Sequence, residues 1–126
     1  MSKEESFEPV NPKFKNAKKW SLKKIEKAID KEAEGVSVTK STVRKLESQI
    51  SALIQKCSDL IGEQVTSETL EKHAQRIQDK VMIIELKTYE TEIKLITNQL
   101  IQARARLQDH SLAKNHLLDI VKRKNQ

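Results

Sequence analysis

Residues 82–121, MIIELKTYETEIKLITNQLIQARARLQDHSLAKNHLLDIV, contain a heptad ladder that decides the fold. Its members are spaced alternately by four and three residues, the spacing that holds one face of a helix against another helix. They are Met82, Leu86, Tyr89, Ile93, Ile96, Leu100, Ala103, Leu107, His110, Lys114, Leu117 and Val121. No catalytic, metal-binding or nucleotide-binding motif accompanies the ladder, so the sequence predicts how the molecule assembles rather than a reaction.

Composition favours an all-α protein. The 126 residues are 37% hydrophobic and include two glycines and two prolines, which leaves few turn residues for a β-rich fold. There is no apolar run near the roughly 18 residues of a membrane span and no signal-peptide pattern. We therefore expect an intracellular protein, cytoplasmic or nuclear, and the single Cys57 excludes an intramolecular disulfide.

Start and stop signals predict helices on both sides of two glycines. Ser21 is placed to cap a first helix, with Trp20 and Ile25 at the two positions of a hydrophobic staple. Gly35 and Gly62 are placed to end the first and second helices. A third start has Thr66 as the cap, with Val65 and Leu70 at the staple positions, and no glycine or proline follows before Lys122.

These signals predict an N-terminal three-helix bundle followed by a long, coiled-coil-like C-terminal helix. The expected parts are a flexible basic arm at 1–19, a bundle at 20–88 with helices at about 22–34, 41–62 and 67–88, and a helical stalk at 89–126 that continues the third helix.

Four successive apolar residues, 81–84, surround the whole circumference of the third helix, so this turn must be enclosed. Tight antiparallel connections would bring Leu46 and Ile50 of the second helix to this level. Ile25 and Ile29 of the first helix would reach the same level, which makes residues 81–84 the expected centre of the bundle.

Beyond residue 88 no predicted helix remains to cover the ladder, and a bare apolar edge favours a partner. The predicted interaction seam consists of Tyr89, Ile93, Ile96, Leu100, Ala103 and Leu107. The partner is a second copy or another coiled-coil protein, because the seam residues fit no single oligomer pattern. A break near residues 109–111 that folds the chain end back over the ladder is the alternative.

Positive charge is concentrated at the two ends of the chain. Residues 13–27 hold seven lysines against Glu26, and residues 100–126 have a net charge of +4. The candidate polyanion-binding residues are Lys13, Lys15, Lys18, Lys19, Trp20, Lys23, Lys24, Lys122, Arg123 and Lys124. Lysines neutralise phosphates, while Phe14 and Trp20 could stack on bases or enter a lipid interface. We favour nucleic acid over membrane, because the lysines lie on several sides of the expected helix.

The remaining polar and reactive residues predict no enzyme, metal site, cofactor or small-molecule ligand. His73, His110 and His116 have no ligand or nucleophile-base spacing, and Cys57 occupies an apolar ladder position, which favours core packing over reactivity. His110 and Lys114 interrupt the seam. They are either a polar pair that sets the register, with His110 as a pH-sensitive contact, or a frayed break in which Ser111 caps a final helix, the alternative we favour.

The order of basic arm, short helices and long charged helix resembles the helical N-terminal region of Gag-like proteins of some retroelements. It is also similar to many small coiled-coil subunits of cytoskeletal or trafficking complexes. The first hypothesis is thus a non-enzymatic helical assembly or scaffold protein. The alternatives are a nucleic-acid-binding structural protein, Gag-like or viral, whose basic arm is displayed on a helical oligomer, and a membrane-surface adaptor.

Overall fold

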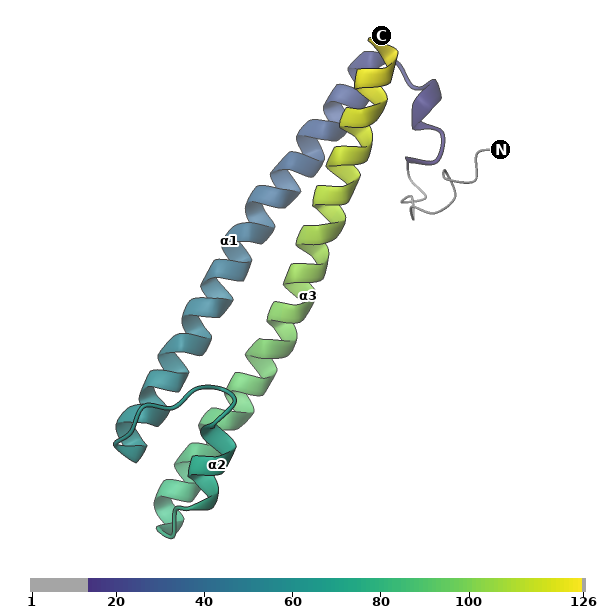
Figure 1. Cartoon of the computed structure of the whole chain (residues 1–126). Coiled ribbons are helices and arrows are strands. Elements are labelled where there is room, and N and C mark those ends of the chain that lie inside the picture. Colours follow the sequence, from purple (N-terminus) through teal and green to yellow (C-terminus); the bar gives the residue numbers. More distant parts are fainter. Residues whose placement is uncertain (1–13, 126) are drawn as a thin grey trace. The chain divides into compact units, whose positions relative to one another are not determined.

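The computed structural model describes residues 14–125, and within this range the chain forms helices and no strand. The elements are a 3-10 helix η3 (Ala17–Lys19) and the α-helices α1 (Leu22–Ile61), α2 (Leu70–Gln75) and α3 (Lys80–Lys124) (Figure 1). The all-α prediction is confirmed. None of the helices in the described range combines the length and the apolar content that crossing a membrane requires.

Two compact units share the long helices. The terminal unit contains described residues 14–40 and 105–125, and the central unit contains residues 41–104. The first half of α1 packs on the last half of α3 in the terminal unit, and the other two halves pack together in the central unit. The two helices run antiparallel within each unit (Figure 1).

The ends of α1 follow the sequence signals. Ser21 caps its start, where the backbone N–H of Lys24 donates to Ser21 Oγ over 3.2 Å. At the other end Gly62 adopts a φ of +85°, and its N–H donates to the Ser58 carbonyl over 2.8 Å. Glycine suits this position because L side chains rarely adopt such a φ.

The predicted break at Gly35 is wrong, because α1 passes through this residue and joins the two helices expected at 22–34 and 41–62. The physical reason is a close approach of α3. A Cβ at position 35 would lie 2.7 Å from Nδ1 and Cε1 of His110, so glycine is needed here for space rather than for a turn.

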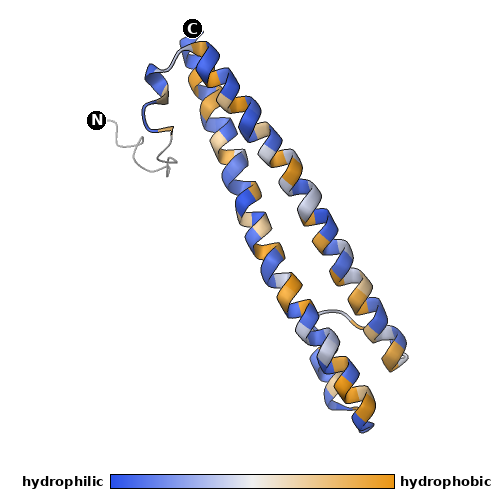
Figure 2. Ribbon diagram, turned by 180° about the vertical axis from the view of Figure 1, so that it is seen from behind, coloured by the Kyte–Doolittle hydropathy of each residue, from blue (hydrophilic) through white to orange (hydrophobic). Residues whose placement is uncertain are grey.

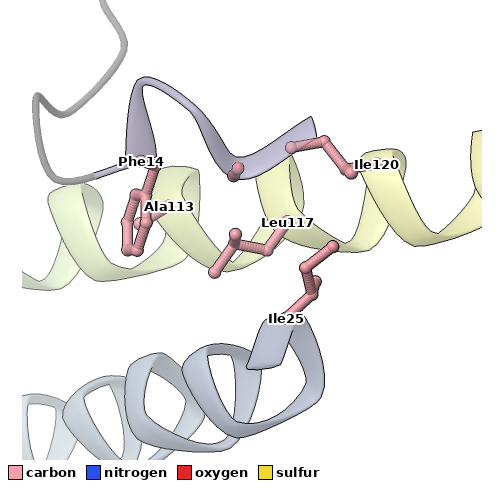
Figure 3. Close-up of a cluster of buried hydrophobic side chains, with 6 residues drawn as sticks. Phe14, Ile25, Ala113, Leu117 and Ile120 are labelled. Atoms are coloured by element: carbon pink, nitrogen blue, oxygen red, sulfur yellow. The ribbon is translucent and has the colours of Figure 1, made fainter. Parts of the chain in front are cut away.

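The terminal unit is closed by a cluster of buried apolar residues. Ile25 of α1 meets Leu117, Ala113 and Ile120 of α3, and Phe14 packs on the same cluster (Figure 3). Phe14 and Ala17 are buried, so the prediction of a flexible arm is wrong for residues 14–19. The rest of that arm, residues 1–13 with Lys13, lies outside the described residues.

In the central unit, α1 residues pack against a different part of α3 from the one predicted. Leu46 packs on Leu100 and Ala103 of α3 instead of on residues 81–84. A second cluster joins Leu53 and Cys57 of α1 to further ladder residues of α3. The difference arises because residues 62–79, which hold α2, form a longer connection than the tight turn that we expected.

The long third helix predicted from residue 67 is interrupted. Thr66 and Thr69 exchange backbone-to-hydroxyl hydrogen bonds of 2.9 and 3.2 Å, but the helix that follows, α2, ends at Gln75. Asp79 caps a new helix, since its Oδ1 accepts from the N–H groups of Val81 and Met82 over 2.9 and 3.2 Å.

From its start at Lys80, α3 continues without a break through residues 109–111. The predicted frayed break at Ser111 is therefore wrong, and so is the fold-back of the chain end. A second correction concerns the first turn of α3, where Val81 and Ile84 remain 66% and 65% exposed. In the single chain this turn is not enclosed.

Candidate functional site

The predicted interaction seam lies against α1 instead of facing solvent. Ile93, Leu100 and Ala103 are buried, and the other three seam residues, Tyr89, Ile96 and Leu107, are half-buried. The prediction of an uncovered seam is thus wrong for the single chain. The physical reason is that α1 is longer than expected and carries a ladder of its own.

The ladder on α1 has the same spacing as that on α3. It runs Ile25, Ile29, Glu32, Val36, Thr39, Val43, Leu46, Ile50, Leu53, Cys57 and Leu60. Glu32 and Thr39 are buried polar members of it. Because these two side chains interrupt the apolar pattern next to Gly35, the sequence indicated two separate helices.

One polar interruption of each ladder meets the other in the terminal unit. Nδ1 of His110 lies 2.8 Å from Oε1 of Glu32, whose side chain is only 4% exposed. The His110 ring also covers Gly35. His110 thus interrupts the ladder of α3 because it pairs with the polar residue in the ladder of α1, a match visible in the sequence only once α1 is continuous.

Basic residues from both ends of the chain come together in the terminal unit. Lys18 of η3 and Ile120, Arg123 and Lys124 of α3 line a shallow pocket of about 250 Å³. The other described candidates also belong to this unit. They are the half-buried Trp20 and five exposed lysines, Lys15, Lys19, Lys23, Lys24 and Lys122. The sequence predicted two basic regions, and the fold places residues of both around one pocket.

Charge is distributed unequally between the two units. The described part of the terminal unit has thirteen lysines and arginines against six acidic residues, a net charge of +7. The central unit has nine of each sign and is neutral. Electrostatic attraction for a polyanion is therefore a property of the terminal unit.

The aromatic residues next to these lysines serve packing. Phe14 is buried and meets Trp20 edge to face, with ring centroids 6.1 Å apart. Nζ of Lys24 lies 4.3 Å from the centroid of the half-buried Trp20 ring, a cation–π contact. Burial of Phe14 argues against its stacking on a base, whereas the half-buried Trp20 keeps part of its ring at the surface beside Lys24.

Cys57 lies in the core of the central unit, as its ladder position predicted, and is fully buried. Burial raises the pKa of its thiol, and the negative charge of Glu90 raises it further. The thiol therefore stays protonated and poorly nucleophilic near neutral pH. Among the described residues no group of three or more His, Cys, Asp or Glu side chains is arranged to hold a metal ion.

An apolar surface that the sequence analysis missed lies on the outer face of α3. Val81, Ile84 and Leu95 are exposed large side chains, each with more than half of its surface accessible. Figure 2 shows hydrophobic residues gathered in the first turns of α3. The apolar run at 81–84 indicates such a surface in the sequence, but the pattern predicts that the first and second helices cover it.

Comparison with known protein families, with characterised proteins and with solved structures gives no match to this chain.

Proposed function

We propose that the chain is a non-enzymatic assembly or scaffold protein that acts by packing helix on helix, with a second copy or with another coiled-coil protein. The observation that carries the proposal is the apolar face that remains on α3 after α1 has covered the inner ladder. Val81, Ile84 and Leu95 are at least 59% exposed on this one helix. Exposed apolar side chains on one helix face are typical of surfaces that bind a partner.

The proposal includes two finer statements. The antiparallel pairing of α1 with α3 in each unit is a coiled coil, supported by a four-and-three ladder on both helices. The protein works inside the cell, in the cytoplasm or the nucleus, which agrees with its single, buried cysteine. Docking uses the outer face of α3, because use of the inner seam would first require α1 to leave it.

Light scattering of the full chain over a range of concentrations, combined with chemical cross-linking in cells, tests the proposal. Ile84→Asp with Leu95→Asp should abolish the association. This holds for self-association and equally for binding to a partner that cross-linking has captured and that has then been purified. Leu22→Asp with Leu118→Asp is the matched control, because these residues are also exposed but belong to the terminal unit. A protein that stays monomeric and binds no purified helical partner would refute the proposal.

A nucleic-acid-binding structural protein is the second candidate, and one observation favours it. Lys18 from the start of the described chain and Arg123 with Lys124 from its end line the same pocket, on a unit whose described residues have a net charge of +7. Such a cluster attracts phosphates without reading sequence. A membrane-surface adaptor is the third candidate, which flotation with anionic liposomes would test.

Binding of labelled single-stranded DNA and RNA at increasing salt tests the second candidate. At about 50 mM salt we expect binding that falls steeply with salt, with a slope of about −0.7 for each phosphate neutralised. Changing Lys18, Lys19, Arg123 and Lys124 to Gln should weaken binding. The same change at Lys45, Lys56, Lys72 and Arg76 of the central unit is the control for total charge. Absence of binding at this salt concentration would exclude the candidate.

A further inference from the structure

The outer face of α3 carries a second ladder with the same spacing as the inner one. Its members are Val81, Ile84, Thr88, Thr91 and Leu95, spaced alternately by three and four residues, and all five are exposed. None of them is charged. The spacing that keeps the inner ladder on α1 would keep this outer ladder on another helix.

The two threonines of the outer ladder hide their polar atoms within α3. Thr88 Oγ1 donates to the carbonyl of Ile84 over 3.0 Å, and Thr91 Oγ1 donates to the carbonyl of Lys87 over 2.9 Å. With both hydroxyls bonded to their own helix, the methyl groups are the parts of these side chains left for packing. The outer ladder can therefore be covered by a helix without leaving an unsatisfied hydroxyl.

Charged residues border the outer ladder in two rows of seven-residue spacing. Lys80, Lys87 and Lys94 each precede one of its positions, while Glu85 and Glu92 each follow one. All five side chains are exposed, and none forms an ion pair within residues 14–125. One border is thus uniformly positive, and the other is uniformly negative.

This charge order is complementary to itself in one orientation. When two identical helices pack parallel and in register, each lysine of the positive border faces the residue five places further along the other helix. Lys80 then meets Glu85 of the second copy, and Lys87 meets Glu92 of the second copy. A two-fold axis repeats both contacts, giving four attractive pairs. In the antiparallel arrangement lysines would face lysines and glutamates would face glutamates.

We propose that a second copy of the chain docks on the outer ladder of α3 over residues 80–95, parallel and in register. The inference rests on the proposed assembly function and names its partner. Docking encloses the apolar turn at 81–84, of which Met82 already packs inside the central unit while Val81 and Ile84 remain exposed. The long connection through α2 leaves this turn uncovered in the single chain, and the second copy covers it.

Charge reversal at one pair tests the inference in the full chain. In sedimentation equilibrium at low salt, Lys87→Glu and Glu92→Lys should each raise the dimer dissociation constant about tenfold or more, because each places like charges together at two sites. An equimolar mixture of the two variants should form a heterodimer, and the doubly substituted chain, with its wild-type net charge, should dimerise like the wild type. High salt should reduce these differences.

Disulfide trapping tests the orientation. In a Cys57→Ala background, Leu95→Cys should cross-link under mild oxidation, because equivalent ladder positions lie opposite each other across a parallel, in-register pair. Val38→Cys on α1, at a residue with the same 59% exposure, should not. A dimer that ignores the charge reversals, or one that traps no disulfide at position 95, would overturn the inference. A monomer that still binds a different helical protein through Ile84 would also overturn it, while the proposed function would stand.

Discussion

At the scale of single residues, one polar layer explains why a glycine lies inside a 40-residue helix. Glycine in a helix interior normally destabilises by about 1 kcal/mol relative to alanine. In this chain Gly35 makes room for the ring of His110, which is held in place by the buried carboxylate of Glu32 at 2.8 Å. The three residues therefore form one packing unit, and their effects on stability should not be additive.

Gly35→Ala should destabilise the protein by about 1 to 3 kcal/mol, although alanine favours helix, because the new Cβ would lie 2.7 Å from the His110 ring. In a His110→Ala background the same substitution should instead stabilise by up to about 1 kcal/mol, since the obstacle is gone and only helix propensity remains. Unfolding by urea measures both values. Equal effects of Gly35→Ala in the two backgrounds would contradict the close approach.

Cys57 provides a pH prediction with a defined sign. Burial raises the pKa of its thiol in the folded state, so the folded protein keeps the proton at a pH where the unfolded chain has lost it. The thiol has no effect on the pH dependence of stability well below the pKa that it has in the unfolded chain. As pH rises past that value, stability falls until the pH passes the folded pKa.

The wild type should accordingly lose stability relative to Cys57→Ala as pH rises from about 8 to 10, while their difference stays constant below pH 7. Comparing the two proteins cancels the titration of all other groups. Denaturant unfolding at each pH measures the difference. A constant difference across the whole range would show that the thiol pKa is not raised.

At the scale of helices, the start or end of a helix was predictable where the residue at that position favours only one local structure. Ser21 begins α1 and Gly62 follows its end, as the sequence indicated. Both positions depend on local hydrogen bonds, from the N–H of Lys24 to Ser21 Oγ and from the N–H of Gly62 to the Ser58 carbonyl. Gly35 was misread because a glycine is favoured both by a helix end and by a close neighbour. Only the position of His110, 75 residues further along the chain, distinguishes the two.

The interaction seam was also predictable only in part. The spacing identified its residues and indicated that they pack on another helix. It did not identify that helix as α1, because the polar residues Glu32 and Thr39 interrupt the apolar ladder of α1. The basic residues were likewise identified by composition, but their meeting around one pocket depends on the antiparallel packing of α1 on α3.

Two leucines of α3 that are five residues apart distinguish the inner from the outer face. Leu100 is 6% exposed and packs on Leu46, whereas Leu95 is 59% exposed. Leu100→Asp should cost at least about 3 kcal/mol of stability, because it removes buried apolar contacts and buries a charge. Leu95→Asp should change the stability of the monomer by less than about 0.5 kcal/mol.

Thermal unfolding followed by circular dichroism at low protein concentration measures both leucine variants. The low concentration matters because dimerisation would add to the stability of the wild type but not of Leu95→Asp. If Leu100→Asp leaves the monomer stable, α1 does not cover the inner ladder, and the exposed seam that the sequence first indicated would be restored.

At the scale of the whole molecule, net charge and the outer ladder belong to different units. The described part of the terminal unit carries a net positive charge, and the neutral central unit carries the outer ladder of α3. A neutral surface suits self-association, since two strongly charged surfaces of equal sign would repel. A dimer made through the central unit would carry two basic terminal units, so assembly and polyanion binding should be coupled through valency.

Coupling between dimerisation and polyanion binding predicts that affinity depends on the length of the nucleic acid. If the dimer presents two basic surfaces to one long nucleic acid, the second contact is intramolecular, and overall affinity should exceed that of a monomer by about 10² or more. Lys87→Glu should therefore weaken binding to a long single strand much more than binding to an oligonucleotide that only one terminal unit can occupy. Fluorescence anisotropy with strands of both lengths measures the two losses at one salt concentration.

The variant with both Lys87→Glu and Glu92→Lys controls for the local change of charge, because its dimer should form again and its affinity for long strands should return. Neutralising Lys18 and Lys124 should instead weaken binding to short and long strands alike, since these residues lie at the basic pocket itself. Equal losses on both strand lengths for Lys87→Glu would mean that the central unit touches the nucleic acid directly. Assembly and polyanion binding would then use one surface. The assignment of assembly to the central unit and of polyanion binding to the terminal unit would be wrong.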